Sequence, residues 1–572
     1  MGQPKQININ TSVTKKVTYD AIVVGSGISG GWAAKELCER GLKTLLLERG
    51  RNVEHIKDYP TAANKPWDFP NRLELTEKNK NESPVQSLNY NEGSKDFYVN
   101  DKDHPYVQEK PFNWIRGYQV GGRSLTWGRQ TYRLSNLDFE ANLKDGHGTD
   151  WPIRYKDIAT WYDYVETFVG ISGQNEGIPH LPDGIFLPPM EMNCIEKHFA
   201  EKVKSHFTER YVINGRVANL SKGWSGRGPC QYRNLCDRGC PFGGYFSSNS
   251  ATIPAAIFTG NLTLRTNAIV TEVILDEKTG KASGVRVIDQ LTHETFEYFA
   301  KIIFLNASTI GTTSILLQSI SQRFPNGLGN TSGQIGLNLM DHHSGSGASG
   351  EHEQFKNQYY KGRRPTGIYI PRFRNINEKS KHADFLRGYG FQADGERREW
   401  QDLMNEDNGF GEVYKQTLIK PGPWTMYMGA WGECLPNAAN KVTLDATKKD
   451  KWGLPQVNID FRYGDNERLM RNDAKNSAAE MLEIAGFKNI DKFDYNFIGG
   501  STIHEMGTAR MGNDSKTSVL NKFNQMHDVP NVFITDGSCM PSGGCQNPSL
   551  TYMALTARAC DFAVKELKKN NL

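Results

Sequence analysis

The chain has 572 residues, more than a single hydrophobic core accommodates, so two or more domains and a buried cofactor are expected. Its 68 Lys and Arg residues nearly balance 64 Asp and Glu residues. The resulting net charge of +4 provides no long-range field for polyanions, which excludes charge-driven binding of nucleic acid or of an anionic membrane.

The first sixteen residues, M-G-Q-P-K-Q-I-N-I-N-T-S-V-T-K-K, contain no apolar core, so no signal peptide is expected. No run of about 18 apolar residues follows, so no membrane span is expected either, and a cytoplasmic location is the default. The nine cysteines are odd in number, and six are scattered without metal-ligand spacing. A disulfide framework is therefore not expected. The polar stretches around 77–100 and 396–408 are typical of surface loops.

The amino-terminal region has the pattern of a nucleotide-binding unit. Residues 17–25, V-T-Y-D-A-I-V-V-G, predict a strand that leads into G-S-G-I-S-G. A helical segment ending near Gly41 follows, and a second strand ends in Glu48. In a dinucleotide fold the glycines allow the backbone to approach a pyrophosphate at the helix N-terminus, and the acid binds a ribose hydroxyl. This pattern predicts a Rossmann-like domain and leaves NAD and FAD open.

Five later segments of the chain bear on the choice between NAD and FAD. They are R-G-Y-Q-V-G-G-R-S-L-T-W-G (116–128), I-G-L-N-L-M-D-H-H (335–343), H-E-M-G-T-A-R-M-G (504–512), I-T-D-G-S-C-M-P (534–541) and N-P-S-L-T-Y-M-A-L (547–555). Together with the first glycine cluster, and in this order, they resemble the glucose-methanol-choline (GMC) flavoprotein oxidoreductases over nearly the whole chain. The resemblance implies FAD and an α/β fold, in which a Rossmann-like FAD-binding domain carries an inserted, sheet-based substrate-binding domain.

By this resemblance, residues 16–60, 112–150, 222–345 and 494–572 form the discontinuous FAD-binding domain, and residues 61–111, 151–221 and 346–493 form the substrate-binding domain. Strands at 266–275 and 301–307 are expected in the nucleotide sheet, and alternating residues predict further strands at 387–392 and 452–461. The implied FAD contacts are Gly25, Ser26, Gly27, Ile28, Ser29, Gly30, Glu48, Arg49, Gly121, Gly122, Ser124, Thr126, Trp127, Gly128, Val270, Ala307, Asp536, Gly537, Asn547, Pro548 and Thr551. In the branch that includes pyranose oxidase, a histidine near the second glycine cluster can link covalently to the flavin. This sequence has Thr126 there, so non-covalent FAD is expected.

The resemblance also implies a catalytic pair, His504 and Asn547. Oxidation of an alcohol by a flavin requires a base that takes the hydroxyl proton while hydride leaves the same carbon. A neutral imidazole can accept this proton, and an amide can hold the substrate oxygen. Three other histidines, His342, His343 and His527, are interpreted as structural.

The segment C-Q-Y-R-N-L-C-D-R-G-C-P places Cys230, Cys236 and Cys240 close together before Pro241. Three thiolates are too few for a closed structural zinc site unless a fourth ligand comes from elsewhere in the chain, and thiolates are the usual ligands of iron–sulfur clusters. The spacing resembles the loop that holds a three-iron four-sulfur cluster in the catalytic subunits of bacterial FAD-dependent sugar dehydrogenases. The alternative is a loop without metal, in which two of the cysteines pair or all three stay free.

The resulting hypothesis is an FAD-dependent dehydrogenase that oxidises a sugar or glycoside, either at a ring hydroxyl to a ketone or at the anomeric carbon to a lactone. Trp424, Tyr389 and Gln392 are candidate substrate contacts. The alternatives are a pyranose-oxidase-like sugar oxidase that uses oxygen and a non-catalytic flavin redox carrier. The expected partners are an external electron acceptor, a small chaperone-like subunit and a cytochrome. Export with a signal-bearing partner would place the protein in the periplasm.

Overall fold

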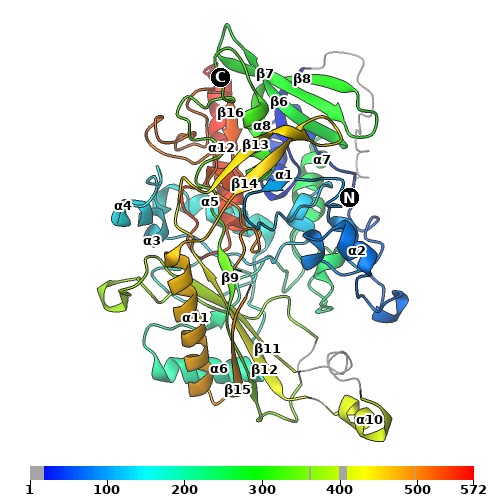
Figure 1. The fold of residues 1–572 in the computed structure, drawn as a ribbon, viewed down its shortest axis with the longest axis vertical. Helices are drawn as coiled ribbons and strands as arrows, with labels where there is room; N and C mark the ends of the chain where they lie inside the picture. Colours follow the sequence, from blue (N-terminus) through cyan, green and yellow to red (C-terminus); the bar gives the residue numbers. More distant parts are fainter. Residues whose placement is uncertain (1–17, 360–361, 398–408, 421, 496) are drawn as a thin grey trace.

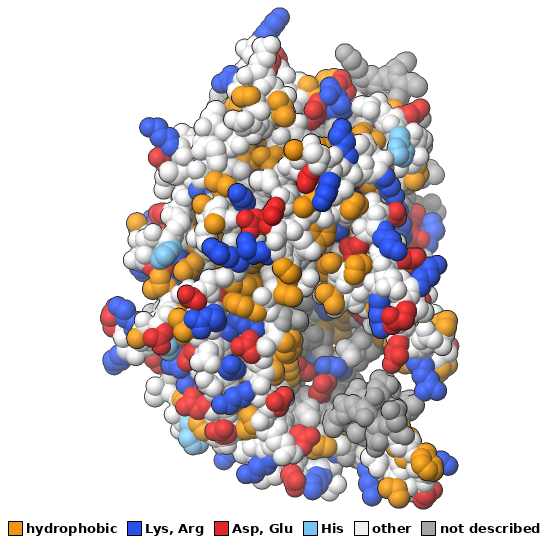
Figure 2. All heavy atoms as spheres, in the orientation of Figure 1, with side chains coloured by type: hydrophobic (Ala, Val, Ile, Leu, Met, Phe, Trp, Pro, Cys, Tyr) orange, Lys and Arg blue, Asp and Glu red, His pale blue; other side chains and the backbone are white. Residues whose placement is uncertain are grey.

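The computed structural model describes residues 18–359, 362–397, 409–420, 422–495 and 497–572. The amino-terminal segment expected to lack a signal peptide, and most of the polar stretch 396–408, therefore lie outside the described residues. Stretch 77–100 contains short helical turns between its loops. Figure 1 shows an elongated molecule with sheets at both ends, and Figure 2 shows positive and negative side chains interspersed over one face.

The helices are α1 (Ile28–Glu39), α2 (Glu77–Glu82), α3 (Asn136–Phe139), α4 (Ala141–Asp145), α5 (Ala159–Val169), α6 (Cys194–His206), α7 (Ile253–Phe258), α8 (Thr309–Gln318), α10 (Gly411–Ile419), α11 (Asp465–Ile484) and α12 (Ser549–Lys568). The strands are β1 (Thr18–Val24), β2 (Thr44–Leu47), β3 (Val107–Gln108), β4 (Ile213–Asn214), β5 (Leu262–Arg265), β6 (Ala268–Asp276), β7 (Lys281–Asp289), β8 (Thr295–Leu305), β9 (His343–His352), β10 (Ile368–Ile370), β11 (Tyr389–Arg397), β12 (Trp424–Gly432), β13 (Lys441–Lys449), β14 (Pro455–Asp460), β15 (Lys488–Asp494) and β16 (Val532–Ile534). Among the described residues, no helix is long and apolar enough to cross a membrane.

The first sheet has the Rossmann-like arrangement predicted from the sequence. Within the described residues its order is β5-β2-β1-β8-β7-β6, with β16 also paired to β8. Strands β5, β2, β1, β8 and β16 are parallel, whereas β6 and β7 form an antiparallel extension. Helices α1, α7 and α12 bury apolar residues against this sheet. Because helices cover its central strands, those strands carry continuous apolar runs rather than alternation.

The parallel strands end at the same edge of the sheet. The backbone turns at Gly25 after β1, Glu48 follows β2, and Asn306 follows β8. In open sheets of this kind, ligands bind beyond the carboxyl ends of the strands. The topology therefore gathers the turns after β1, β2 and β8 around one site.

The second large sheet, in the described part of the chain, has the order β15-β9-β12-β11-β10-β4, with antiparallel pairing throughout. Helices α6 and α11 pack on one face of it. Strand β11 alternates, because Tyr389 and Phe391 are in the core beneath these helices whereas Gln392 contacts Asn547 near the first sheet. Tyr389 and Trp424 are 0% and 1% exposed. The side chains of Tyr389 and Trp424 pack in this core, so the prediction that these two residues contact substrate was wrong.

A third, smaller sheet has the order β13-β14-β3 among the described strands, and it contains the strand predicted at 452–461. The predicted domain bounds stay a prediction. Helix α5, which they assign to the substrate-binding domain, shares a hydrophobic core with the first sheet, where Tyr162 and Val165 are fully buried together with Leu550.

Candidate active site

A cavity of about 350 Å³ opens at the carboxyl edge of the first sheet. The predicted FAD contacts that line it are Gly25, Ser26, Gly27, Ile28, Ser29, Glu48, Arg49, Gly122, Ser124, Thr126, Trp127, Gly128, Val270, Ala307, Asp536, Gly537, Asn547 and Pro548. Three predicted contacts lie behind this lining. A Cβ on Gly30 would lie 1.8 Å from the Gly25 carbonyl oxygen, and Gly121 packs against Asn249. Thr551 bonds the buried Tyr162 hydroxyl at 2.8 Å.

The two glycines on either side of Ser26 meet different constraints. Gly25 has φ +92°, and its Cβ would lie 2.3 Å from the Asn306 carbonyl oxygen. Gly27 has φ −64°, and apart from its neighbours in the chain no described heavy atom lies within 4 Å of the position where its Cβ would be. Gly25 is therefore required by the protein backbone, whereas the absence of a side chain at Gly27 keeps the cavity open.

Glu48 is held rigidly at the end of β2. Its carboxylate accepts hydrogen bonds from the Ser26 N–H at 3.1 Å, the Ser26 hydroxyl at 2.5 Å and the Gly50 N–H at 2.9 Å. Burial raises the pKa of Glu48, and the bond from Ser26 acts against this shift. The carboxyl group lines the cavity in a fixed orientation, as recognition of a ribose hydroxyl requires.

The N-termini of three helices meet at the cavity, since Gly27 precedes α1, Ser308 precedes α8 and Pro548 precedes α12. In the described structure no side chain caps any of these three ends. Their free N–H groups and helix dipoles create positive potential in the cavity. This environment suits a pyrophosphate and a reduced, anionic flavin.

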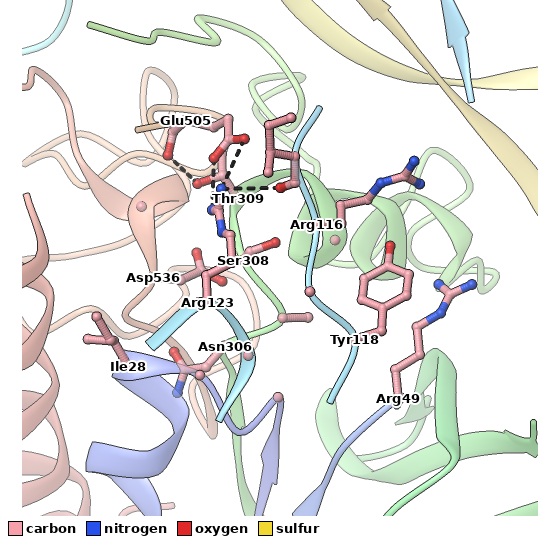
Figure 3. A pocket seen from close by; sticks show the side chains of 18 of the residues that line it. Ile28, Arg49, Arg116, Tyr118, Arg123, Asn306, Ser308, Thr309, Glu505 and Asp536 are labelled. Carbon is pink, nitrogen blue, oxygen red and sulfur yellow. Dashed lines mark hydrogen bonds and ion pairs between the residues drawn. The ribbon is translucent and has the colours of Figure 1, made fainter. Parts of the chain in front are cut away.

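Sequence reasoning missed several lining residues that Figure 3 shows around the cavity. Arg123 forms an ion pair with Glu505 at 2.9 Å, and both residues lie near Thr309. Tyr118, which was also missed, stacks with its ring on the predicted contact Arg49 at 4.7 Å. The missed residues Arg123, Glu505 and Tyr118 lie in quoted motifs, but their side-chain directions depend on the fold. The buried Asn306 Nδ2 has no partner among the described residues, so the cavity wall retains a free donor for a ligand.

His504 and Asn547 meet at the cavity wall although 43 residues separate them. Asn547 Nδ2 lies 3.5 Å from His504 Nε2. Burial lowers the pKa of His504 well below its usual range, and the electrostatic interactions with His342 and Arg123 add to this shift, so the ring is neutral at pH 7. On the far side of the amide, Gln392 Nε2 donates to Asn547 Oδ1 at 2.7 Å. This bond directs the Asn547 NH₂ group toward His504.

The structural interpretation of His342 is incomplete, because its ring contacts His504. The two Nδ1 atoms lie 2.9 Å apart, and His342 Nε2 lies 2.7 Å from the Gly544 carbonyl oxygen. His343 and His527 have other neighbours, Met470 Sδ at 3.1 Å and Ser518 Oγ at 3.0 Å respectively. Adjacent histidines in the motif D-H-H thus have different surroundings, and the sequence does not distinguish them.

The three clustered cysteines lie in one partly buried loop, and all nine cysteines of the chain, which lie in the described part, are free. Burial raises the pKa of Cys230 to about 11, and repulsion from Cys236 and Cys240 adds to this shift. The Tyr232 N–H points at Cys230 Sγ (3.4 Å), and the Gly244 N–H points at Cys240 Sγ (3.3 Å). Among the described residues, no group of three His, Cys, Asp or Glu side chains is arranged to hold a single metal ion.

Comparison with known proteins places these observations in a family. Models of the GMC oxidoreductase family match residues 19–344 and 436–556. The chain is 29% identical to 2-methyl-1,2-propanediol dehydrogenase of Mycolicibacterium austroafricanum, over 95% of this chain and 94% of that protein. It is 25% identical to the fructose dehydrogenase large subunit of Gluconobacter japonicus, over 97% and 99%. Its fold is similar to that of pyridoxine 4-oxidase from Mesorbium loti, with a TM-score of 0.60, 15% identity and coverage of 96% and 99%.

These matches confirm the predicted family, fold class and enzyme class, and family membership implies FAD as the cofactor. The glycine turn, Glu48 and the uncapped helix ends fit this cofactor. The chain belongs to the GMC oxidoreductase family and is an oxidoreductase of CH–OH groups.

Proposed function

We propose that this enzyme oxidises a hydroxyl group of a sugar or glycoside, with His504 as the base that takes the hydroxyl proton. FAD, when bound, supplies the acceptor for hydride from the same carbon. The observation that carries the proposal is the position of His504 Nε2 beside Asn547 in the cavity wall. A neutral imidazole accepts the proton, and the Asn547 amide holds the substrate oxygen next to it. The product is a ring ketone or a lactone.

Two features support a sugar rather than a small diol as the substrate. Two relatives, the fructose dehydrogenase large subunit and a gluconate 2-dehydrogenase flavoprotein of Pantoea cypripedii, are named for sugar-type substrates. Gln392 reaches the catalytic amide from the six-stranded sheet, so a polar strand face adjoins the site. The name of the diol dehydrogenase relative makes a diol the competing substrate class.

Anaerobic mixing of the FAD-loaded enzyme with sugars, glycosides, polyols and 1,2-diols tests this proposal. Bleaching of the flavin absorbance by a sugar or glycoside is the expected result. Bleaching by diols alone would show that the substrate is a diol rather than a sugar, and no bleaching by any alcohol would favour the redox-carrier alternative. Reoxidation of the bleached enzyme by oxygen at the rate of turnover would favour an oxidase over a dehydrogenase.

The proposal includes a route for electrons through the cysteine loop, in which Cys230, Cys236 and Cys240 hold a three-iron four-sulfur cluster. In such a cluster each thiolate binds a different iron, so the sulfurs need not converge on one point. Two observations support this assignment. The Cys236 and Cys240 thiolates raise the pKa of Cys230, as expected of neighbouring thiols, and two backbone N–H groups are directed at the sulfur atoms of Cys230 and Cys240. Arg129, which lines the cavity, also acts on the Cys230 thiolate, so the loop adjoins the flavin region.

The remaining proposals concern partners and location. A cluster of this kind would pass electrons singly to an external acceptor such as a cytochrome, and a small chaperone-like subunit would assist export. A cytoplasmic location is proposed for the chain by itself, and a periplasmic one if a signal-bearing partner exports it. Fractionation of cells that produce the chain with and without the proposed signal-bearing partner tests these two locations.

A further inference from the structure

His342 lies directly before strand β9 and is completely buried. Its ring is perpendicular to that of His504, with an interplanar angle of 89° and a centroid separation of 5.0 Å. His342 Nδ1 lies 2.9 Å from His504 Nδ1, and His342 Nε2 lies 2.7 Å from the Gly544 carbonyl oxygen. Each nitrogen of His342 therefore has a short polar contact.

These two contacts determine where the protons reside. A carbonyl oxygen is only an acceptor, so His342 Nε2 must carry a proton and donate it to Gly544. Burial lowers the pKa of His342, which keeps the ring neutral and leaves its Nδ1 as an acceptor. The proton between the two rings then belongs to His504 Nδ1. His504 is neutral as well, so its Nε2 carries a lone pair.

We propose that His342 is a positioning residue that fixes the tautomer of His504, so that Nε2 of His504 is the atom that accepts the substrate proton. The inference rests on the proposed alcohol oxidation. In that reaction the hydroxyl proton passes to His504 Nε2, the carbinol hydrogen leaves as hydride to the flavin, and the alcohol becomes a carbonyl compound. The opposite tautomer of His504 would present an N–H to the substrate and could take no proton there.

The groups around the two rings agree with this arrangement. Asp341 accepts the backbone N–H of His504 at 3.0 Å and the Thr502 hydroxyl, so its carboxyl group orients the backbone rather than the ring. Glu505 pairs with Arg123. In the described part of the chain, no carboxylate contacts the His504 ring, so the orienting partner of the base is a neutral imidazole.

The hydrogen bonds on the opposite side of the ring, at His504 Nε2, also indicate an unprotonated Nε2. Gln392 donates to Asn547 Oδ1, which leaves the Asn547 NH₂ group as the donor toward His504 Nε2. At 3.5 Å this last contact is long, so the Nε2 lone pair is only weakly engaged. A substrate hydroxyl placed between the two residues would donate to His504 and accept from Asn547.

The tautomer can be measured without substrate. Selective ¹⁵N labelling of histidine and NMR of the FAD-loaded enzyme distinguish protonated from unprotonated ring nitrogens, with His504→Gln used to assign the signal. We expect a protonated Nδ1 and an unprotonated Nε2 in His504. A protonated Nε2 would overturn the proposal, while a failure of sugars to bleach the flavin would count against the proposed function alone.

Three variants at one position test the role of His342. In His342→Asn the amide oxygen takes the place of Nδ1 as an acceptor for His504, whereas His342→Leu has no acceptor and His342→Gln reaches toward Gly544. We expect flavin reduction by substrate to slow by about 10²-fold or more in the Leu and Gln variants, because the His504 ring then lacks the acceptor that fixes its tautomer and orientation. The Asn variant should remain within about 10-fold of the parent, as loss of part of one hydrogen bond implies.

His343→Asn is the matched control, since this neighbour is equally buried but contacts Met470 rather than His504. It should retain the parent ¹⁵N pattern of His504. Equal rates in the Asn and Leu variants, with FAD bound in both, would reduce His342 to a packing residue. Parent rates in the Leu variant would do the same.

Discussion

Replacing Gly27 with alanine separates a ligand-binding requirement from a folding requirement. The backbone at Gly27 has φ −64°, which alanine adopts, and apart from neighbouring residues of the chain no described heavy atom lies within 4 Å of the position of the new methyl group. A Gly→Ala change at such a site stabilises a fold by about 0.4–1 kcal/mol, because the unfolded chain loses freedom. The apoprotein should therefore be at least as stable as the parent.

FAD binding should respond in the opposite direction. The methyl group would project into the cavity at the start of α1, where the pyrophosphate approaches backbone N–H groups. Loss of one hydrogen bond to a charged group costs about 1.5–3 kcal/mol. That loss corresponds to an FAD dissociation constant roughly 10- to 150-fold larger.

Gly30→Ala is the comparison variant, because its Cβ would lie 1.8 Å from the Gly25 carbonyl oxygen and the backbone must move by more than an ångström. This overpacking should cost the apoprotein about 1–3 kcal/mol. Fluorescence titration of both apoproteins with FAD, together with thermal unfolding, gives the two quantities. If Gly27→Ala binds FAD with parent affinity, or is destabilised as much as Gly30→Ala, the cavity assignment is wrong.

Three other predictions concern catalysis, electron transfer and pH. His504→Ala should retain FAD, while flavin reduction by substrate slows by about 10²- to 10⁴-fold in stopped-flow absorbance, and near-parent turnover would exclude His504 as the base. Anaerobically prepared enzyme should contain about three irons per flavin, and Cys236→Ser should lose iron and reduce a protein acceptor slowly while substrate still bleaches the flavin. No iron after reconstitution would leave an ordinary loop. Burial and the nearby Glu505 raise the pKa of Asp341 from 3.8 to about 7, so the folded state binds a proton that the unfolded chain releases, and stability falls as pH rises between these values. Asp341→Asn should flatten this part of the Tm-against-pH profile, and an unchanged slope would contradict the assigned pKa direction.

The sequence alone determined the parts of this protein that depend on local chemistry. The strand, glycine turn, helix, second strand and Glu48 follow each other within about thirty residues, so chain connectivity itself places them around one ligand. Ordered motifs then predicted the family, and most predicted FAD contacts line the cavity. The glycine turn at Gly25 was predictable because its positive φ is a local demand of the backbone.

Only the tertiary structure decided which distant side chains meet. His342 was interpreted as structural, and nothing in D-H-H distinguishes it from His343. The side chains of these successive residues point in different directions, so His342 contacts His504 whereas His343 contacts Met470. The alternation of β11 directs Gln392 toward Asn547 and buries Tyr389. Contacts across 155 residues, such as Gln392 with Asn547, arise where strand β11 meets the loop before helix α12. The direction of each side chain therefore depends on strand register and sheet packing, which residue spacing alone does not reveal.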